Sequence, residues 1–148
     1  VFTSALHRYR LLALAIQEIP FFYLSSEEMA EDRIHYAIDS IKHFSKLYPA
    51  EKLFFIIGAD SLLDLPGWRA GRRLLKLADF IVAGRPGTEA EDLDGSFGKV
   101  HSDCPFSSSE IREKLKKNAQ VEGMLDEKVL RYIALNELYA LSGRPDLL

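Results

Sequence analysis

Apolar residues recur at helical spacing in four stretches of the chain, with charged residues between them. The predicted helices cover residues 8–19, 36–48, 107–118 and 126–138. Pro20 and Pro49 end the first two, because proline cannot continue a helix.

Short apolar runs between these helices predict strands. Residues 53–57 and 80–83 are continuously apolar and are each followed by glycine, which is typical of parallel strands covered on both faces. Residues 21–24 are a short aromatic run, and residues 99–102 form a fourth, weaker candidate. Strands that alternate with helices predict an α/β fold, Rossmann-like, with a mainly parallel sheet and helices on both faces.

Length and composition limit the kind of protein. A chain of 148 residues that is 47% hydrophobic can bury one sizeable core, so we expect a single domain over residues 1–148. Its net charge of -3 comes without a polybasic tract, so neither nucleic acid nor a membrane is an expected partner. The single cysteine, Cys104, fits a reducing compartment, and we expect a cytoplasmic protein. The sequence leaves open whether the protein forms a homo-oligomer.

The end of the strand at residues 53–57 carries the first candidate site. Ligands of open α/β sheets bind beyond the carboxyl ends of the strands, which is where Gly58 and Asp60 follow. The Asp60 carboxylate can accept hydrogen bonds from sugar hydroxyls, and Gly58 permits close approach by a ring or a phosphate. The alternative is structural: Gly58 turns the chain, and Asp60 caps a helix that starts at Ser61.

Residues 107–112 are the second candidate, because Ser107 and Glu110 have the spacing of a capping box. The free N–H groups of the following helix, the serine hydroxyls and the Arg112 guanidinium together could hold phosphate. The alternative is an ordinary capped surface helix with a solvated arginine.

Trp68 is the only tryptophan and lies in the expected loop after Pro66-Gly67, where its ring could stack on an aromatic ligand or merely cover the sheet edge. No two of the four histidines have the spacing of a metal site, so we interpret them as surface or packing residues and predict no metal held by the protein.

Three ordered segments closely resemble the motifs of bacterial nicotinate-nucleotide adenylyltransferases, members of the nucleotidylyltransferase superfamily. They read Ile-Ile-Gly-Ala-Asp-Ser-Leu-Leu at 56–63 with Leu-Pro-Gly-Trp at 65–68, Gly-Arg-Pro-Gly at 84–87, and Phe-Ser-Ser-Ser-Glu-Ile-Arg at 106–112. The segments at 36–41 and 129–139 are similar to a helix start and to the closing helix of that family.

The resemblance implies adenylyl transfer from ATP, with Mg2+, to nicotinate mononucleotide, forming a dinucleotide and pyrophosphate. It implies that Asp60 holds a ribose and that Trp68 stacks on the pyridine ring. The other residues that it places at the pyridine nucleotide are Tyr36, Ala37, Gly58, Ala59 and Arg85. The residues that it places at the ATP phosphates are Ser107, Ser108, Ser109 and Arg112, with Arg112 also stabilising the leaving pyrophosphate.

Three departures from the family pattern stand out. The glycine-rich opening segment, Gly-x-Phe-x-Pro-x-His-x-Gly-His, is not among these residues, so we expect a first strand and helix to be missing and a sheet edge or apolar face to be left uncovered. Ala37 replaces a common threonine, which weakens the argument for nicotinate over nicotinamide. Ser109 replaces a threonine and keeps the hydroxyl.

Two other functions remain open at this stage. One is a noncatalytic nucleotide-binding module that has lost the histidine segment. The other is a related nucleotidylyltransferase with a different phosphorylated acceptor, such as phosphopantetheine, although the spacing of Trp68 from Asp60 argues against it.

Overall fold

The computed structural model describes residues 3–29, 34–84 and 97–140. Contacts divide the chain into two compact units, one formed by Glu31–Pro105 and the other by Val1–Ala30 with Phe106–Leu148. The single domain expected from the length stays a prediction. Arg85 and most of the acidic segment 88–98, which we expect to be a surface loop, lie outside the described residues.

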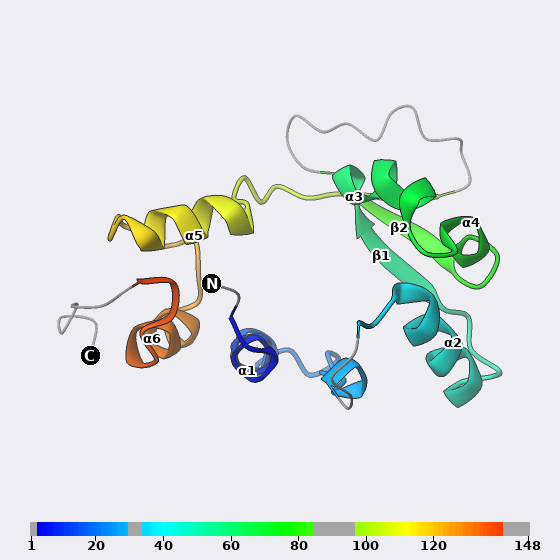
Figure 1. The fold of residues 1–148 in the computed structure, drawn as a ribbon, viewed down its shortest axis with the longest axis horizontal. Helices are drawn as coiled ribbons and strands as arrows, with labels where there is room; N and C mark the ends of the chain where they lie inside the picture. The colour runs from blue at the N-terminus through cyan, green and yellow to red at the C-terminus, as the bar shows by residue number, and fades with distance from the viewer. Residues whose placement is uncertain (1–2, 30–33, 85–96, 141–148) are drawn as a thin grey trace. The chain divides into compact units, whose positions relative to one another are not determined.

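The first unit is built on a parallel sheet (Figure 1). Its strands are β1 (Phe54–Gly58), β2 (Asp79–Gly84) and β3 (Gly98–His101), hydrogen-bonded in the order β1-β2-β3. Gly58 pairs with Ala83, so the carboxyl ends of β1 and β2 lie side by side. Three of the four predicted strands are thereby confirmed with small shifts of their ends, and so is the α/β class.

Helices α2 (Ala37–Leu47), α3 (Ala59–Asp64) and α4 (Gly71–Leu74) pack with one face of this sheet. The shared core contains Ile38, Ile41, Ile57, Leu62, Leu74, Phe80 and Val82. The strands alternate between their two faces, so Phe54 and Ile56 point away from this core. They are 55% and 70% exposed, and Val100, on the same face through the register, is 53% exposed. In this unit the described helices thus cover one face of the sheet.

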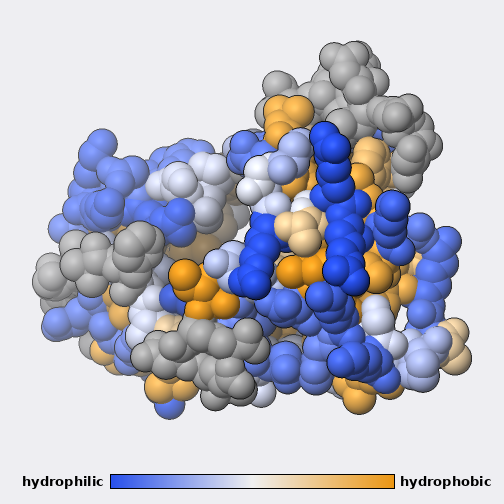
Figure 2. Space-filling view, turned by 45° about the vertical axis from the view of Figure 1, so that its right-hand side comes forward, coloured by the Kyte–Doolittle hydropathy of each residue, from blue (hydrophilic) through white to orange (hydrophobic). Residues whose placement is uncertain are grey.

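β1 is the outer strand of the described sheet, and the expectation of a missing first strand stays a prediction. Figure 2 shows apolar surface between hydrophilic side chains on the side of the molecule that it draws.

Three short elements after β1 are not predicted by the spacing of apolar residues in the sequence. They are α3, the 3-10 turn η2 (Leu65–Gly67) and α4. None is longer than 6 residues, which is too short for a repeating apolar pattern to be recognised. Another 3-10 turn, η1 (Glu27–Met29), belongs to the second unit.

Helices α1 (Ala5–Ile16), α5 (Ser108–Lys116) and α6 (Glu127–Leu135), with the short η3 (Leu138–Ala140), make up the second unit. All three helices were predicted, with ends shifted by a few residues. Leu11 and Leu14 of α1 pack against a core formed by Leu115, Val121, Val129, Leu130 and Ile133. A hydrogen bond to Glu18 raises the pKa of Lys128 at the start of α6. No helix in the described parts of the chain is long and apolar enough to cross a membrane.

The strand predicted at residues 21–24 is wrong. These residues form a turn and irregular structure, and Phe21 and Tyr23 are 74% and 91% exposed. A strand is stable only when a neighbour pairs with its N–H and C=O groups, and the described strands pair with one another instead. An aromatic run alone therefore does not make a strand.

Candidate functional site

The end of β1 brings Gly58 and Asp60 into close contact. A methyl group on Gly58 would lie 2.5 Å from Oδ1 of Asp60, so glycine leaves the room that the carboxylate occupies. Oδ1 also accepts a hydrogen bond from the backbone N–H of Ser61, at 2.9 Å, and the Asp60 side chain is exposed. Asp60 therefore sits at the carboxyl edge of the sheet with an oxygen left to accept from a ligand.

The structural alternative for Asp60 is wrong in its details. Helix α3 begins at Ala59 rather than at Ser61, and its N-cap residue is Gly58, which makes no side-chain cap. The Asp60 carboxylate instead bonds the N–H of the next residue, from within the first turn. A negative charge there still favours the helix electrostatically.

Trp68 is anchored to the protein core on one side. It is half-buried and packs with the core of the sheet unit, its ring perpendicular to that of Phe55 with the centroids 6.5 Å apart. Such a perpendicular contact is a favoured geometry for two aromatic rings and restrains the tryptophan side chain. Trp68 is the C-cap of η2, so the tryptophan expected in a loop directly follows a helical turn and packs on the core of the sheet unit.

Tyr36 and Ala37 lie at the start of α2 and pack against the same core as Trp68. The guanidinium carbon of Arg69 lies over the Tyr36 ring, 4.5 Å from its centroid. Arg69 is not among the residues singled out from the sequence. Its position directly after Trp68 was the one available signal.

A tight turn fixes the backbone on both sides of Arg69. The N–H of Gly71 donates to the carbonyl of Trp68 at 3.0 Å, and Ala70 between them has a left-handed conformation with φ 57°. A methyl group on Gly71 would lie 1.9 Å from the carbonyl oxygen of Leu65, so no other residue fits there without movement of the backbone. The turn therefore has one well-defined shape.

The start of α5 gathers hydroxyls and a guanidinium. Ser107 is the N-cap, and its Oγ accepts from the N–H of Glu110 at 3.1 Å, as the capping-box spacing predicts. Nη2 of Arg112 donates to Oγ of Ser108 at 3.3 Å and to Oγ of Ser109 at 3.4 Å. Arg112 thus lies back along the helix over its first turn and is exposed to solvent.

The candidate residues fall into two groups. Tyr36, Ala37, Gly58, Ala59, Asp60 and Trp68 belong to the sheet unit, whereas Ser107, Ser108, Ser109 and Arg112 belong to the helical unit. Each group is brought together within its own unit. Arg85 lies outside the described residues.

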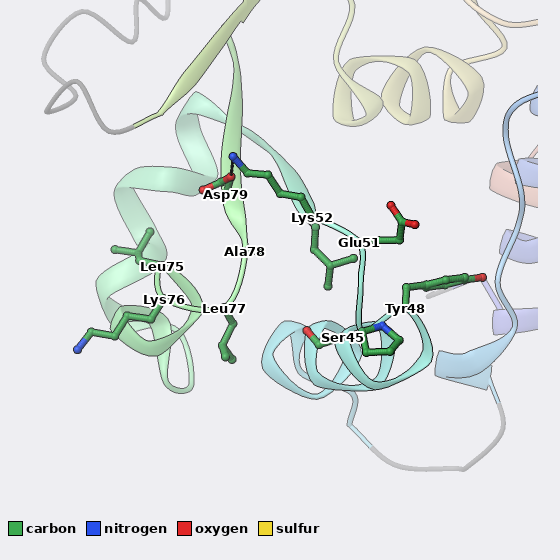
Figure 3. A pocket seen from close by; sticks show the side chains of 11 residues that line it. Ser45, Tyr48, Glu51, Lys52, Leu75, Lys76, Leu77, Ala78 and Asp79 are labelled. Carbon is green, nitrogen blue, oxygen red and sulfur yellow. Dashed lines mark ion pairs between the residues drawn. The ribbon is translucent and has the colours of Figure 1, made fainter.

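A cavity of about 400 Å3 opens at the other end of the strands (Figure 3). It lies where β1 and β2 begin, next to the last turn of α2, with Tyr48 and Leu77 among its lining residues. Nζ of Lys52 and Oδ2 of Asp79 form an ion pair on its wall, at 2.5 Å. Ligands of open α/β sheets bind at the carboxyl ends of the strands. This cavity lies at the opposite ends, so we do not assign it to the candidate site.

The described histidines fit a surface or packing role where their contacts are defined. Nδ1 of His7 lies 2.8 Å from the hydroxyl of Tyr132, and Nε2 of His101 lies 3.2 Å from Asp103. Across residues 3–29, 34–84 and 97–140, no three His, Cys, Asp or Glu side chains gather as a metal site would require.

Comparisons with known proteins find relatives that match most of the chain. A family model described as cytidylyltransferase-like matches residues 1–114. The chain is 34% identical over 150 residues to the probable nicotinate-nucleotide adenylyltransferase of Thermoanaerobacter sp. (strain X514), covering 93% of this chain and 71% of that protein. It is 36% identical over 141 residues to the nicotinate-nucleotide adenylyltransferase of Bacillus subtilis (strain 168), covering 93% and 73%.

Solved structures show the same fold. The Plasmodium falciparum nicotinic acid mononucleotide adenylyltransferase complexed with NaAD superposes with a TM-score of 0.77 at 19% identity, covering 94% of this chain and 76% of that chain. The same enzyme complexed with APC gives a TM-score of 0.77 at 20% identity, over 93% and 77%.

Proposed function

The chain belongs to the nicotinate-nucleotide adenylyltransferase family of cytidylyltransferase-like proteins, and we propose from this that it transfers an adenylyl group from ATP to nicotinate mononucleotide. The observation that carries the proposal is the similarity to two such enzymes over 93% of the chain. The products are a dinucleotide, deamido-NAD, and pyrophosphate.

The reaction joins two phosphates without a protein nucleophile. An oxygen of the mononucleotide phosphate attacks the α-phosphorus of ATP, a new P–O bond forms, and the bond to the β-phosphate breaks with its electron pair going to pyrophosphate. Such a transfer is accelerated mainly by positioning and by stabilisation of negative charge. Mg2+ enters as part of the ATP substrate and shields the phosphate charges.

The start of α5 is suited to the ATP phosphates. Free backbone N–H groups at the helix start favour anions, and Ser108 and Ser109 add hydroxyls that can donate to phosphate oxygens. Arg112 already contacts both hydroxyls, so a phosphate bound between them meets a preplaced guanidinium. We assign Arg112 the role of stabilising the charge that grows on the leaving pyrophosphate, with Ser107 holding the helix start in place.

The end of β1 is suited to the pyridine nucleotide. The exposed Asp60 carboxylate accepts from ribose hydroxyls, and Gly58 and Ala59 let the ligand approach the backbone. Trp68 packs on Phe55 with perpendicular rings, so its ring is already restrained and can stack on the pyridine with little further loss of side-chain entropy. Tyr36 and Ala37 form the neighbouring wall. Arg85 is assigned to the same ligand from its motif alone.

A substrate panel tests the proposal. The full-length protein is incubated with ATP and Mg2+ together with nicotinate mononucleotide, nicotinamide mononucleotide or phosphopantetheine, and dinucleotide and pyrophosphate are quantified. Equal amounts of deamido-NAD and pyrophosphate are expected with the first acceptor. Faster transfer to phosphopantetheine would reassign the acceptor, and absence of any product would favour a noncatalytic nucleotide-binding module.

A further inference from the structure

Arg69 carries a charge at the candidate pyridine site that the assignments above leave unused. Its guanidinium carbon lies over the Tyr36 ring at 4.5 Å, and its side chain is exposed. Among the residues that the structure describes, no carboxylate forms an ion pair with it. A guanidinium held against an aromatic face keeps N–H donors at its edge for another partner.

The backbone holds Arg69 in place. It is the second residue of the turn from Trp68 to Gly71, which is closed by the 3.0 Å hydrogen bond from the Gly71 N–H to the Trp68 carbonyl. Ala70 accepts an unfavourable φ of 57° in that turn, and Gly71 is the only residue type that clears the Leu65 carbonyl. A strained, closely fitted turn next to a binding surface is typical of a functional position.

The surroundings identify the chemical group that Arg69 would meet. Trp68, assigned to the pyridine ring, precedes it directly, and Tyr36, assigned to the neighbouring wall, packs on the same core, so the charge stands beside both aromatic residues. We propose that Arg69 binds the carboxylate of the pyridine nucleotide and sets the preference for the acid over the amide. This inference rests on the proposed function, because it names the specificity of that same site.

The two candidate substrates differ in the way that an arginine detects best. A carboxylate presents two acceptor oxygens and a negative charge to the planar N–H fork, whereas a carboxamide presents one acceptor and an NH2 group whose hydrogens face the arginine donors. Hydrogen bonds to a charged partner are roughly twice as strong as neutral ones. The expected contribution to the acid-to-amide preference is therefore about tenfold.

The ratio of the two affinities separates this role from others. If Arg69 instead held the phosphate or ribose, both mononucleotides would lose affinity equally when it is removed, because they share those groups. If it merely stabilised the turn, the folded fraction would change and the ratio would not.

The test uses calorimetric titration with nicotinate mononucleotide and with nicotinamide mononucleotide. Arg69→Gln should lower affinity for the acid about tenfold and leave the amide nearly unchanged, so that the preference collapses. Arg69→Lys keeps the charge without the planar fork and should retain part of the preference. Arg72→Gln, the same change at another exposed arginine in α4, is the matched control and should leave both affinities as they are.

The titrations distinguish a failure of the Arg69 assignment from a failure of the proposed function. An unchanged acid-to-amide ratio in Arg69→Gln overturns the role of Arg69 while the proposed function stands. Failure of the unmodified full-length protein to bind either mononucleotide overturns the proposed function, and the assignment of Arg69 with it.

Discussion

The two groups of candidate residues are supported in different ways. At the end of β1, Trp68 is half-buried against Phe55, Ala59 is buried, and the turn that follows is fixed by a glycine with no room for a methyl group. At the start of α5, Ser108, Ser109 and Arg112 are all exposed, and the contacts that hold them are a side-chain cap and two long hydrogen bonds.

Because of this difference, substitutions in the two groups should have different effects on protein stability and on ligand binding. Side chains that are shared between a core and a ligand surface affect both properties when they change, because their neighbours are close-packed. Side chains on an exposed helix start have few packing contacts to lose, so their replacement should affect the ligand and leave folding nearly intact.

Gly71→Ala should show how tightly the turn after Trp68 is built. The new methyl group would lie 1.9 Å from a backbone oxygen of Leu65, which cannot move without disturbing the buried core. We expect the free energy of unfolding, measured in urea, to fall by about 3 kcal/mol. Gly67→Ala is the control, since nothing lies within 4 Å of a methyl group there, and a loss as large at Gly67 would contradict the steric account.

Arg112→Gln should show the opposite pattern at the start of α5. Loss of a charged donor to phosphate should weaken binding of ATP with Mg2+ by about 30-fold, equivalent to about 2 kcal/mol. The midpoint of urea unfolding should stay where it is, because the side chain is exposed. Normal binding of ATP by the variant, or a large loss of its stability, would contradict this account of the start of α5.

Gly58→Ala should weaken the pyridine nucleotide site with a smaller cost in stability. A methyl group 2.5 Å from Oδ1 of Asp60 must push the carboxylate aside, and the hydrogen bond to the Ser61 N–H goes with it. A flexible side chain can turn, so folding is affected less than by Gly71→Ala. Affinity for nicotinate mononucleotide should fall about tenfold, equivalent to about 1.4 kcal/mol. Unchanged affinity would remove Asp60 from the site.

Ser107→Ala should give the smallest effect. It removes the oxygen that accepts from the Glu110 N–H, at a typical cost of about 1 kcal/mol in unfolding free energy. Ser107→Gly should cost only a few tenths of that, because glycine suits the N-cap position without a side chain. Equal losses in the two variants would indicate that the hydroxyl does not act as a cap.

The parts of the molecule that the sequence predicts well have strong local signals. Residues 53–57 and 80–83 are apolar without interruption and of strand length, a pattern typical of parallel strands, and the two segments pair in parallel in the structure. Ser107 and Glu110 carry a capping signature whose geometry is local to four residues, and the structure contains its first hydrogen bond. Neither prediction needed knowledge of distant contacts.

The parts that sequence reasoning missed depend on distant contacts. Residues 21–24 have strand composition but no described strand beside them, so their aromatic side chains stay exposed. The Arg69 contact with Tyr36 joins residues 33 positions apart through a turn at Ala70. Alanine rarely adopts a positive φ, so nothing in the local sequence signals that turn.

The most direct test of the central claim is a calorimetric titration of the full-length protein and its Asp60→Ala variant with nicotinate mononucleotide. If the end of β1 holds the pyridine nucleotide, the unmodified protein should bind one equivalent, and the variant should bind at least about tenfold more weakly with its folding unchanged. Equal affinity in the two proteins, or no binding to the unmodified one, would contradict the account.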